Sequence, residues 1–195
     1  QTSINFHLGS NFHVVSYPVD SNRVSFVAAL KNDNKFKESW KEKGTIDDLL
    51  DDVPPRIIDK YKSIKESKNI YKWGVYIRPQ IEFLFKENIT YLGDAAHPIV
   101  PFIGQGGCMA LEDAYAFGYL LSKHNNDIEI AQKNYQKLRL KRIRSIHKSS
   151  LFQAKLNHLS NPFLVRLRNI LMRYTGVISY RTKSIWSYDI TAELS

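Results

Sequence analysis

The sequence predicts an α+β fold, in which an antiparallel sheet is followed by a mostly helical second half. Two runs rich in β-branched and aromatic residues, "NFHVVSYPV" and "RVSFVAAL", flank the turn-forming triplet "DSN" and predict a hairpin. From about Gly107 onward, apolar residues recur at helical spacing. We therefore predict two parts: residues 1–88 with a β-sheet and short helices, and residues 89–195 with a strand, a loop and helices.

Short helices are predicted after the hairpin. In "GTIDDLLDDV", Thr45 is a candidate N-cap, and Asp47 and Asp48 would lie in the first turn, where the helix dipole favours negative charge. Pro54 and Pro55 would end this helix. The next segment, "PRIIDKYKSI", predicts a second short helix.

Two further strands are expected before the helical half. They are "NIYKWGVYIRP" and "ITYLGD", and the second is short and apolar enough to be fully buried.

The helical half divides into three patterned segments. The apolar face predicted for the first consists of Met109, Leu111, Ala114, Phe117, Leu120 and Leu121. The apolar positions of the second, among many basic residues, are Ile130, Tyr135, Leu138, Ile143 and Ile146. The third starts with Asn161 as N-cap and Pro162 at the first helical position.

Charge, cysteine content and hydropathy limit the classes of partner, metal site and location that we expect. The 28 Lys and Arg residues exceed the 19 Asp and Glu residues, so the net charge of +9 could attract nucleic acid, an anionic membrane surface or a small anionic ligand. The single Cys108 excludes an internal disulfide framework and a cysteine-based zinc site, so we expect no metal and a cytoplasmic location. No apolar run is long enough for a spanning helix. Because the chain opens in strand-like sequence without Met, we expect it to belong to a longer protein; the alternative is a degenerate relative without the first half.

The stretch "YLGDAAHPIVPFIGQGGCMALEDAYAF" concentrates backbone freedom between a strand and a helix. Glycines 104, 106 and 107 permit a tight turn and close approach of a ligand to backbone N–H groups. A helix start behind them suits a phosphate, a carboxylate or a heterocycle that becomes anionic, and Asp94 could accept hydrogen bonds from sugar hydroxyls. The alternative is a loop that only turns the chain, with Asp94 capping the turn.

The residues 93–114 resemble a known motif. "GDAAHPIVPFIGQGGCMALEDA" is similar to the second FAD-binding motif of single-component flavin-dependent aromatic hydroxylases with the p-hydroxybenzoate hydroxylase fold. The "HVVSYPV" and "RVSFVAAL" strands, the "Y-x-R-P" segment, the Y-x-x-x-R-x-x-R pattern of Tyr135, Arg139 and Arg142, and the closing "WSYD" are similar to salicylate-hydroxylase-like members. The resemblance implies a substrate-domain sheet joined to the carboxyl-terminal part of a Rossmann-like FAD-binding domain.

The resemblance also implies residue roles in binding FAD. Asp94, next to Gly93, would hydrogen-bond the ribityl chain, and Pro101 would line the flavin face beside the substrate. The backbone around the helix start would hold the pyrimidine end of the ring system. Its residues are Gly104, Gln105, Gly106, Gly107, Cys108 and Met109. Many members have Asn where this chain has Cys108, which leaves the substrate class open.

Five other polar side chains are candidates for a role in the site or its support. His13 and Tyr17 lie four apart in a predicted strand and so share a face. The resemblance implies that they approach an aromatic substrate, where an imidazole could take the phenol proton; the alternative is two polar tips at the edge of a half-buried strand. His97 is expected to be structural and to satisfy backbone groups, and Glu112 and Asp113 to interact with the helix dipole.

The implied activity is that of a monooxygenase that uses FAD, NAD(P)H and O₂ to hydroxylate a small salicylate-like or hydroxybenzoate-like ring. The sequence contains no G-x-G-x-x-G, so we expect weak FAD affinity and no turnover from this chain alone. Two alternatives stay open: a flavin-dependent epoxidase or hydroxylase of a larger non-phenolic substrate, and a non-catalytic module that binds through the basic helix "KLRLKRIRSIHK". We expect no nucleic acid partner and no stable membrane insertion; homodimer formation stays open.

Overall fold

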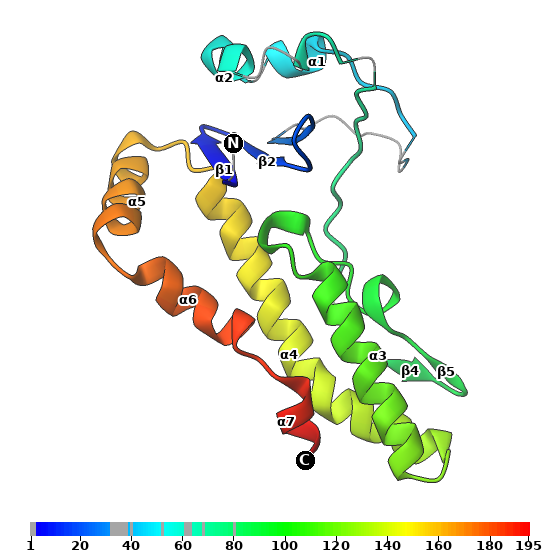
Figure 1. Ribbon diagram of the computed structural model, residues 1–195. Coiled ribbons are helices and arrows are strands. Elements are labelled where there is room, and N and C mark those ends of the chain that lie inside the picture. Colours follow the sequence, from blue (N-terminus) through cyan, green and yellow to red (C-terminus); the bar gives the residue numbers. More distant parts are fainter. Residues whose placement is uncertain are drawn as a thin grey trace. The chain divides into compact units, whose positions relative to one another are not determined.

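The computed structural model describes residues 3–31, 39, 41–51, 53–60, 64–67, 69–79 and 81–195. The chain divides into two compact units, whose elements Figure 1 labels. The first contains Gln1–Val75 and Lys155–Asn169, and the second contains Tyr76–Ala154 and Ile170–Ser195. The predicted boundary between residues 1–88 and 89–195 separates a substrate domain from part of an FAD-binding domain. These compact units do not test that boundary, which stays a prediction.

The first unit contains a three-stranded antiparallel sheet. Its strands, in spatial order, are β1 (Asn5–Gly9), β2 (Phe12–Pro18) and β3 (Val24–Leu30). The predicted hairpin is confirmed: Val19 donates its N–H to the Arg23 carbonyl at 2.8 Å across the turn. The central position of β2 means that both of its edges are hydrogen-bonded.

Two short helices complete the core of this unit. They are α1 (Asp47–Leu50) and α2 (Pro55–Lys60). Ile46 is the N-cap of α1 instead of the predicted Thr45, whose hydroxyl nevertheless accepts a hydrogen bond from the Asp48 N–H at 3.3 Å. Only the first part of the predicted helix "PRIIDKYKSI" is confirmed, because residues 61–63 lie outside the described residues. The buried hydrophobic side chains are Phe12, Val14, Val53, Ile57 and Ile58.

Both strands predicted before the helical half need correction. Residues 69–79 form no strand in the described chain, where a single bridge joins Tyr71 to Lys43. In "ITYLGD" only β5 (Ile89–Thr90) is a strand, paired with β4 (Phe85–Lys86), and Ile89 is 60% exposed instead of buried. A strand requires a hydrogen-bonded neighbour, and the described residues supply only this two-residue partner.

The predicted helical second half is confirmed. Two 3₁₀ turns come first, η2 (Gly93–Ala95) and η3 (Pro101–Ile103). The helices that follow are α3 (Gly106–Lys123), α4 (Ile128–Asn157), α5 (Pro162–Tyr174), α6 (Val177–Trp186) and α7 (Ile190–Leu194). The predicted N-cap of α5 is also confirmed, because Asn161 Oδ1 accepts hydrogen bonds from the N–H groups of Phe163 and Leu164 at 3.0 and 3.2 Å.

The face of α3 that turns inward differs from the predicted apolar face. Leu111 and Ala114 were predicted on the apolar face, but Leu111 is 74% exposed and Ala114 is also exposed. The buried residues of α3 are Met109, Asp113, Ala116 and Leu120, so the inward face is rotated and includes a carboxylate. The buried carboxylate of Asp113 on this face is ion-paired, as described below.

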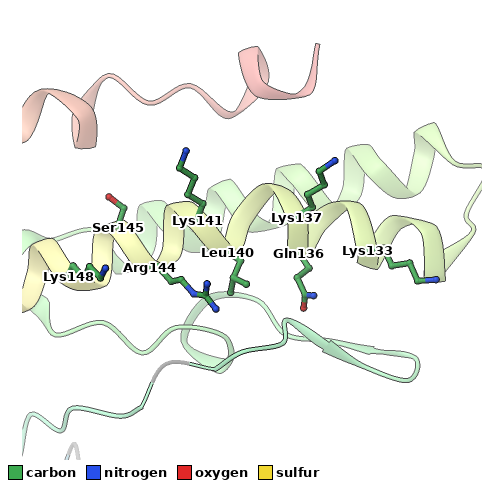
Figure 2. A pocket seen from close by; sticks show the side chains of 8 residues that line it. All are labelled: Lys133, Gln136, Lys137, Leu140, Lys141, Arg144, Ser145 and Lys148. Atoms are coloured by element: carbon green, nitrogen blue, oxygen red, sulfur yellow. The ribbon is translucent and has the colours of Figure 1, made fainter.

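The long helix α4 has one buried side and one basic side. Tyr135, Ile143 and Ile146 are buried as predicted, whereas Ile130 is 44% exposed. Buried Arg139 lies on the same inward side. The outward side carries several lysines, and Figure 2 shows their side chains extending from the helix.

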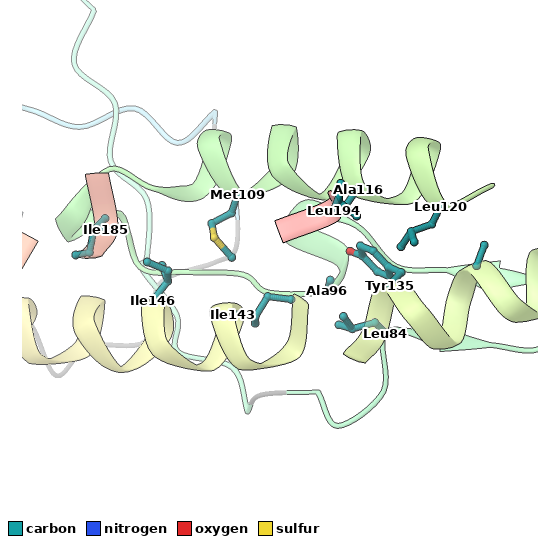
Figure 3. Close-up of a cluster of buried hydrophobic side chains, with 11 residues drawn as sticks. Leu84, Ala96, Met109, Ala116, Leu120, Tyr135, Ile143, Ile146, Ile185 and Leu194 are labelled. Carbon is teal, nitrogen blue, oxygen red and sulfur yellow. The ribbon is translucent and has the colours of Figure 1, made fainter. Parts of the chain in front are cut away.

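A single cluster of buried side chains holds the second unit together (Figure 3). Its members come from the segment before β4, from the end of the turn η2, from α3, from α4 and from the last two helices. They are Leu84, Ala96, Met109, Ala116, Leu120, Ala131, Tyr135, Ile143, Ile146, Ile185 and Leu194. Fully burying one large aliphatic side chain stabilises a protein by roughly 1.5–3 kcal/mol. The cluster therefore fixes α3 against α4, and with it the loop that precedes α3.

Candidate flavin-binding loop

The turn η2 is built around Gly93, which has a positive φ. Leu92 before it is extended, with φ −133° and ψ 155°, and Gly93 then turns the chain with φ +55°. A Cβ added to Gly93 would lie 3.2 Å from the Cβ of Ala110, so a side chain here would press against α3. The Gly93 carbonyl accepts hydrogen bonds from the N–H groups of Ala96 and His97 at 2.9 and 2.8 Å. The turn is thus closed on itself and lies against α3.

One buried carboxylate joins this turn to two helices. Asp113 Oδ2 accepts a hydrogen bond from the Gly93 N–H at 3.0 Å and lies 2.5 Å from His97 Nε2. Asp113 Oδ1 accepts a hydrogen bond from Arg139 Nε at 2.8 Å. The side chains of Asp113 and Arg139 are fully buried. Asp113 therefore fixes the turn, His97 and α4 to a single point on α3.

The charges in this network stabilise one another. Burial acts to raise the pKa of Asp113, but the hydrogen bonds from His97, Gly93 and Arg139 outweigh burial and hold the pKa below its ordinary value. Burial likewise acts to lower the pKa of Arg139, and the paired carboxylates of Asp113 and Glu112 raise it instead. Both groups are therefore ionised at neutral pH.

A second carboxylate extends the network to the carboxyl-terminal helices. Glu112 Oε2 lies 2.7 Å from Arg139, and Glu112 Oε1 lies 3.0 Å from Arg142. Arg142 also donates hydrogen bonds to the carbonyls of Ser184 and Ile185 at 3.0 and 3.1 Å. Two carboxylates thus face two guanidinium groups, and this balance offsets part of the cost of burying them.

The roles expected for three residues of the motif change accordingly. Glu112 and Asp113 do not lie in the first turn of α3, which begins at Gly106, so the predicted interaction with the helix dipole is wrong. Their function is to pair with Arg139 and Arg142. His97 is structural as expected, but its side chain binds a carboxylate instead of backbone groups.

The loop after η3 opens onto the start of α3. Gly104 adopts the left-handed conformation, with φ 63° and ψ 30°, and its N–H donates to the Pro101 carbonyl at 3.1 Å. No described atom lies within 4 Å of a Cβ added at Gly104, Gly106 or Gly107, so open space surrounds these backbone positions. The N–H groups of the first helical residues have no intrahelical acceptor and carry the positive end of an 18-residue helix dipole.

Two buried side-chain nitrogens around the loop have no hydrogen-bond partner among the described residues. Gln105, the N-cap of α3, is 3% exposed, and its Nε2 has no hydrogen-bond partner among the described residues. His97 Nδ1 is also buried and without a partner in the described part of the chain. The Asp94 side chain, by contrast, is exposed at the start of η2. The open backbone N–H groups of the loop fit the polar edge of a flat ring system. The exposed carboxylate of Asp94 fits a hydroxylated chain, whose hydroxyl groups need an acceptor.

His13 and Tyr17 lie in the first unit, whereas the motif residues lie in the second. His13 is 5% exposed, and its Nδ1 lies 2.7 Å from Nε2 of His158, while Tyr17 is 39% exposed. Burial, together with the nearby His158, lowers the pKa of His13 to about 4, so the imidazole is neutral at pH 7. Nothing in the sequence signalled His158, which is distant from His13 along the chain.

A hollow of about 640 Å³ occurs elsewhere in the second unit, along α4. It is lined by Lys133, Gln136, Lys137, Leu140, Lys141, Arg144, Ser145 and Lys148, as Figure 2 shows. None of the predicted site residues contributes to it. Among the described residues, no cluster of three or more potential metal ligands is present.

Comparison with known proteins identifies the class. No protein-family model matches the chain. A 3-amino-4-hydroxybenzoate 2-monooxygenase of Streptomyces platensis is 30% identical over 165 residues, which are 84% of this chain and 42% of that protein. A 3-hydroxybenzoate 6-hydroxylase of Klebsiella oxytoca is 26% identical over 171 residues, 85% of this chain and 41% of that protein.

A solved structure supports the same fold. A salicylate hydroxylase in complex with its substrate superposes with a TM-score of 0.74 over 97% of this chain and 48% of that chain, at 22% identity. The resemblance inferred from the motif is confirmed: the chain is homologous to FAD-dependent aromatic hydroxylases. It spans less than half the length of these relatives.

Replacing the central carboxylate should strongly destabilise the second unit. Asp113→Asn leaves the buried guanidinium of Arg139 with one charged partner fewer, so we expect the free energy of unfolding to fall by about 3 kcal/mol or more. Urea unfolding followed by circular dichroism measures this change. The matched control is Glu129→Gln, which removes the exposed Lys133–Glu129 pair and should have little measurable effect. Equal effects of the two variants would contradict the role assigned to Asp113.

The His13–His158 contact predicts loss of stability in mild acid. The pKa of His13 is about 4 in the folded chain and about 6.5 when unfolded, so the unfolded chain binds the proton first. The stabilisation is complete above pH 6.5 and decreases as the pH falls toward 4. We expect a drop in unfolding free energy between pH 7 and pH 5 that becomes smaller in His13→Gln but not in His147→Gln, measured by urea unfolding. An unchanged drop in His13→Gln would refute it.

Proposed function

We propose that this chain forms the part of a flavin-dependent aromatic hydroxylase that holds the ribityl chain and the isoalloxazine ring of FAD. One observation carries the proposal: the open glycine loop at the start of α3 is fixed, through Asp113 and Gly93, to the turn that presents Asp94. A loop that only turned the chain would not require the network of Asp113, Arg139, Glu112 and Arg142 behind it.

Each proposed contact follows from the position of its group. Asp94 would accept hydrogen bonds from ribityl hydroxyls, because its carboxylate is exposed beside the buried Gly93. The N–H groups of Gly106, Gly107 and Cys108 would face the pyrimidine edge, where reduced flavin carries negative charge. Gln105 Nε2 would donate a further hydrogen bond, which would satisfy a buried group that has no partner among the described residues. Pro101, exposed at the start of η3, would lie along the flavin face.

Met109 is the exception in the proposed set. Its N–H already donates to the Gln105 carbonyl at 2.9 Å, and its side chain is fully buried beneath the loop. We therefore limit the proposed backbone donors to residues 106–108 and assign Met109 to packing.

Bound FAD would take reducing equivalents from NAD(P)H and activate O₂ for transfer to an electron-rich ring. The contribution of this chain is to orient the flavin and stabilise its negative charge. FAD affinity should be weak in these 195 residues, because they contain no G-x-G-x-x-G segment for the diphosphate, and we expect no turnover from them alone. The single exposed Cys108 supports the proposed cytoplasmic location.

For the substrate we propose a small phenolic acid that approaches His13 and Tyr17. A phenol has a pKa near 10, so complete proton transfer to an imidazole of pKa about 4 would be strongly uphill. His13 is therefore better suited to accept a hydrogen bond from the hydroxyl group and to increase the electron density of the ring in that way. The His158 contact would keep the His13 imidazole in one orientation.

Titration with FAD tests the cofactor proposal. We expect saturable quenching of flavin fluorescence by the purified chain, with affinity reduced at least tenfold in Asp94→Ala, because one charge-assisted hydrogen bond contributes about 1.5–3 kcal/mol. The matched control is Glu66→Ala, an exposed carboxylate in the other unit, which should bind as the wild type does. Quenching that is identical in all three proteins would remove Asp94 from the site.

Substrate profiling tests the remaining part in a longer chain that also carries a G-x-G-x-x-G segment. A small phenolic acid should stimulate NAD(P)H oxidation, and His13→Gln should lower that stimulation at least tenfold without changing FAD affinity. Stimulation only by larger non-phenolic compounds would favour the alternative class of flavin-dependent epoxidase or hydroxylase and would leave the FAD assignment intact.

A further inference from the structure

The exposed face of α3 carries no charge, a feature that the contacts within the second unit do not explain. At about 100° per residue, the exposed positions between residues 107 and 122 fall in one sector roughly 140° wide. Leu111 is 74% exposed and Tyr115 is 50% exposed, and no charged residue lies in this sector. We call the following set the outer face of α3: Gly107, Leu111, Ala114, Tyr115, Gly118 and Tyr119.

The helix α4 shows the composition of a solvated face in the same unit. Figure 2 shows side chains that extend from this helix. The exposed residues of α4 between 133 and 148 are Lys133, Lys137, Lys141, Arg144, Ser145 and Lys148. A helix face that stays in water normally carries charged and polar side chains of this kind. The uncharged outer face of α3 therefore indicates contact with another surface.

Gly118 supports the same conclusion. It lies in the interior of α3, where glycine is less favourable than alanine. Its φ is not positive, unlike that of Gly93 or Gly104, and no described atom lies within 4 Å of a Cβ added at Gly118. The described contacts of this chain thus give no reason for a glycine at this position. A backbone that packs closely against α3 from outside would supply one.

The covalent structure of FAD identifies what would cover this face. The outer face begins at Gly107, inside the loop that we propose for the flavin ring. The ribityl chain is a short linker, so the segment that binds the diphosphate must lie beside this loop. Such a segment is typically a G-x-G-x-x-G turn that opens a helix, and this sequence contains none. Two relatives match this chain over 42% and 41% of their length, so the rest of each is long enough to include such a unit.

Other occupants fit the outer face less well. Adsorption to lipid and binding to nucleic acid both use basic side chains, and the outer face has none. The nearest charged groups are Glu112, which is paired with two arginines, and Lys123, whose Nζ lies 5.4 Å from the ring centroid of Tyr119. Among the described helices, none has the length and apolar character that crossing a membrane requires. A second copy of the chain could bury the face but would supply no diphosphate-binding segment.

We propose that the outer face of α3 is the packing surface for the G-x-G-x-x-G half of a longer flavoprotein. The helix that the glycine turn opens would lie alongside α3, and its closest approach would be at Gly118. This inference rests on the proposed flavin function and adds to it the surface to which the diphosphate-binding part of the site attaches.

Cysteine labelling without FAD tests the proposal in two proteins, the 195-residue chain and a longer chain that also carries the G-x-G-x-x-G half. Each has one cysteine in a background with Cys108→Ser and no other thiol. Ser122→Cys lies in the same sector as the outer face, and its reaction with a maleimide should be at least tenfold slower in the longer chain. The matched control, Lys137→Cys on the outward side of α4, should react fast in both proteins. Buried Ala116→Cys should react slowly in both, which shows that both are folded.

A substitution at Gly118 separates packing from stability. Gly118→Leu should leave the urea midpoint of the 195-residue chain unchanged or higher, because leucine favours the helix and no described atom lies close by. In the longer chain the same substitution should accelerate the labelling of Ser122→Cys at least tenfold. The matched control, Lys137→Leu, should leave that labelling slow.

Three results would overturn the proposal. The first is equal labelling of Ser122→Cys in the two proteins. The second is slow labelling in the 195-residue chain that becomes fast on dilution, which would identify a second copy as the occupant. The third is slow labelling in that chain at every concentration, which would mean that its own residues cover the face. Protection in a longer chain that does not bind FAD would refute the flavin function and leave the packing surface intact.

Discussion

The buried carboxylate of Asp113 is the interaction on which the second unit depends. It accepts hydrogen bonds from the turn at Gly93, from His97 and from Arg139, and so it ties a loop and two helices to one point. A buried carboxylate without partners would be expensive, and this arrangement avoids the cost by placing a guanidinium and a backbone N–H against it. The same network leaves the start of α3 open, because the paired groups lie two turns further along the helix. The network around Asp113 thus holds the loop in place and also leaves the backbone at the start of α3 accessible to a ligand.

The elements governed by local patterns could be predicted from the sequence. The hairpin of β2 and β3 and the cap at Asn161 depend on neighbouring residues, and both are as expected. The strands expected at residues 69–79 and 89–94 are absent or reduced, because a strand needs hydrogen-bonded neighbours that the sequence of one segment does not reveal.

The sequence pointed to the residues of the proposed flavin site but not to the ion pairs that support them. The G-D turn and the glycine loop stand together in the chain, so their resemblance to a flavin motif was visible. The supporting pairs were missed, because Asp113 and Arg139 are 26 residues apart and belong to different helices. Two signals were available: the adjacent acids Glu112 and Asp113 in the motif, and the two arginines Arg139 and Arg142 three apart. The two acids alone suggested an interaction with the helix dipole, and the two arginines alone were part of a family pattern. Only the fold shows that the four charges pair with one another.

The central claim is that a network fixed by Asp113 presents Asp94 and the start of α3 to a flavin. Mapping backbone amide shifts by nuclear magnetic resonance, as FAD is added to the isotopically labelled chain, tests it most directly. The account predicts the largest shifts at Gly93, Asp94 and residues 104–108, with little change along α5 or α7. Shifts confined to the basic side of α4, with the loop unchanged, would contradict it and would mean that FAD binds only as an anion on a positive surface.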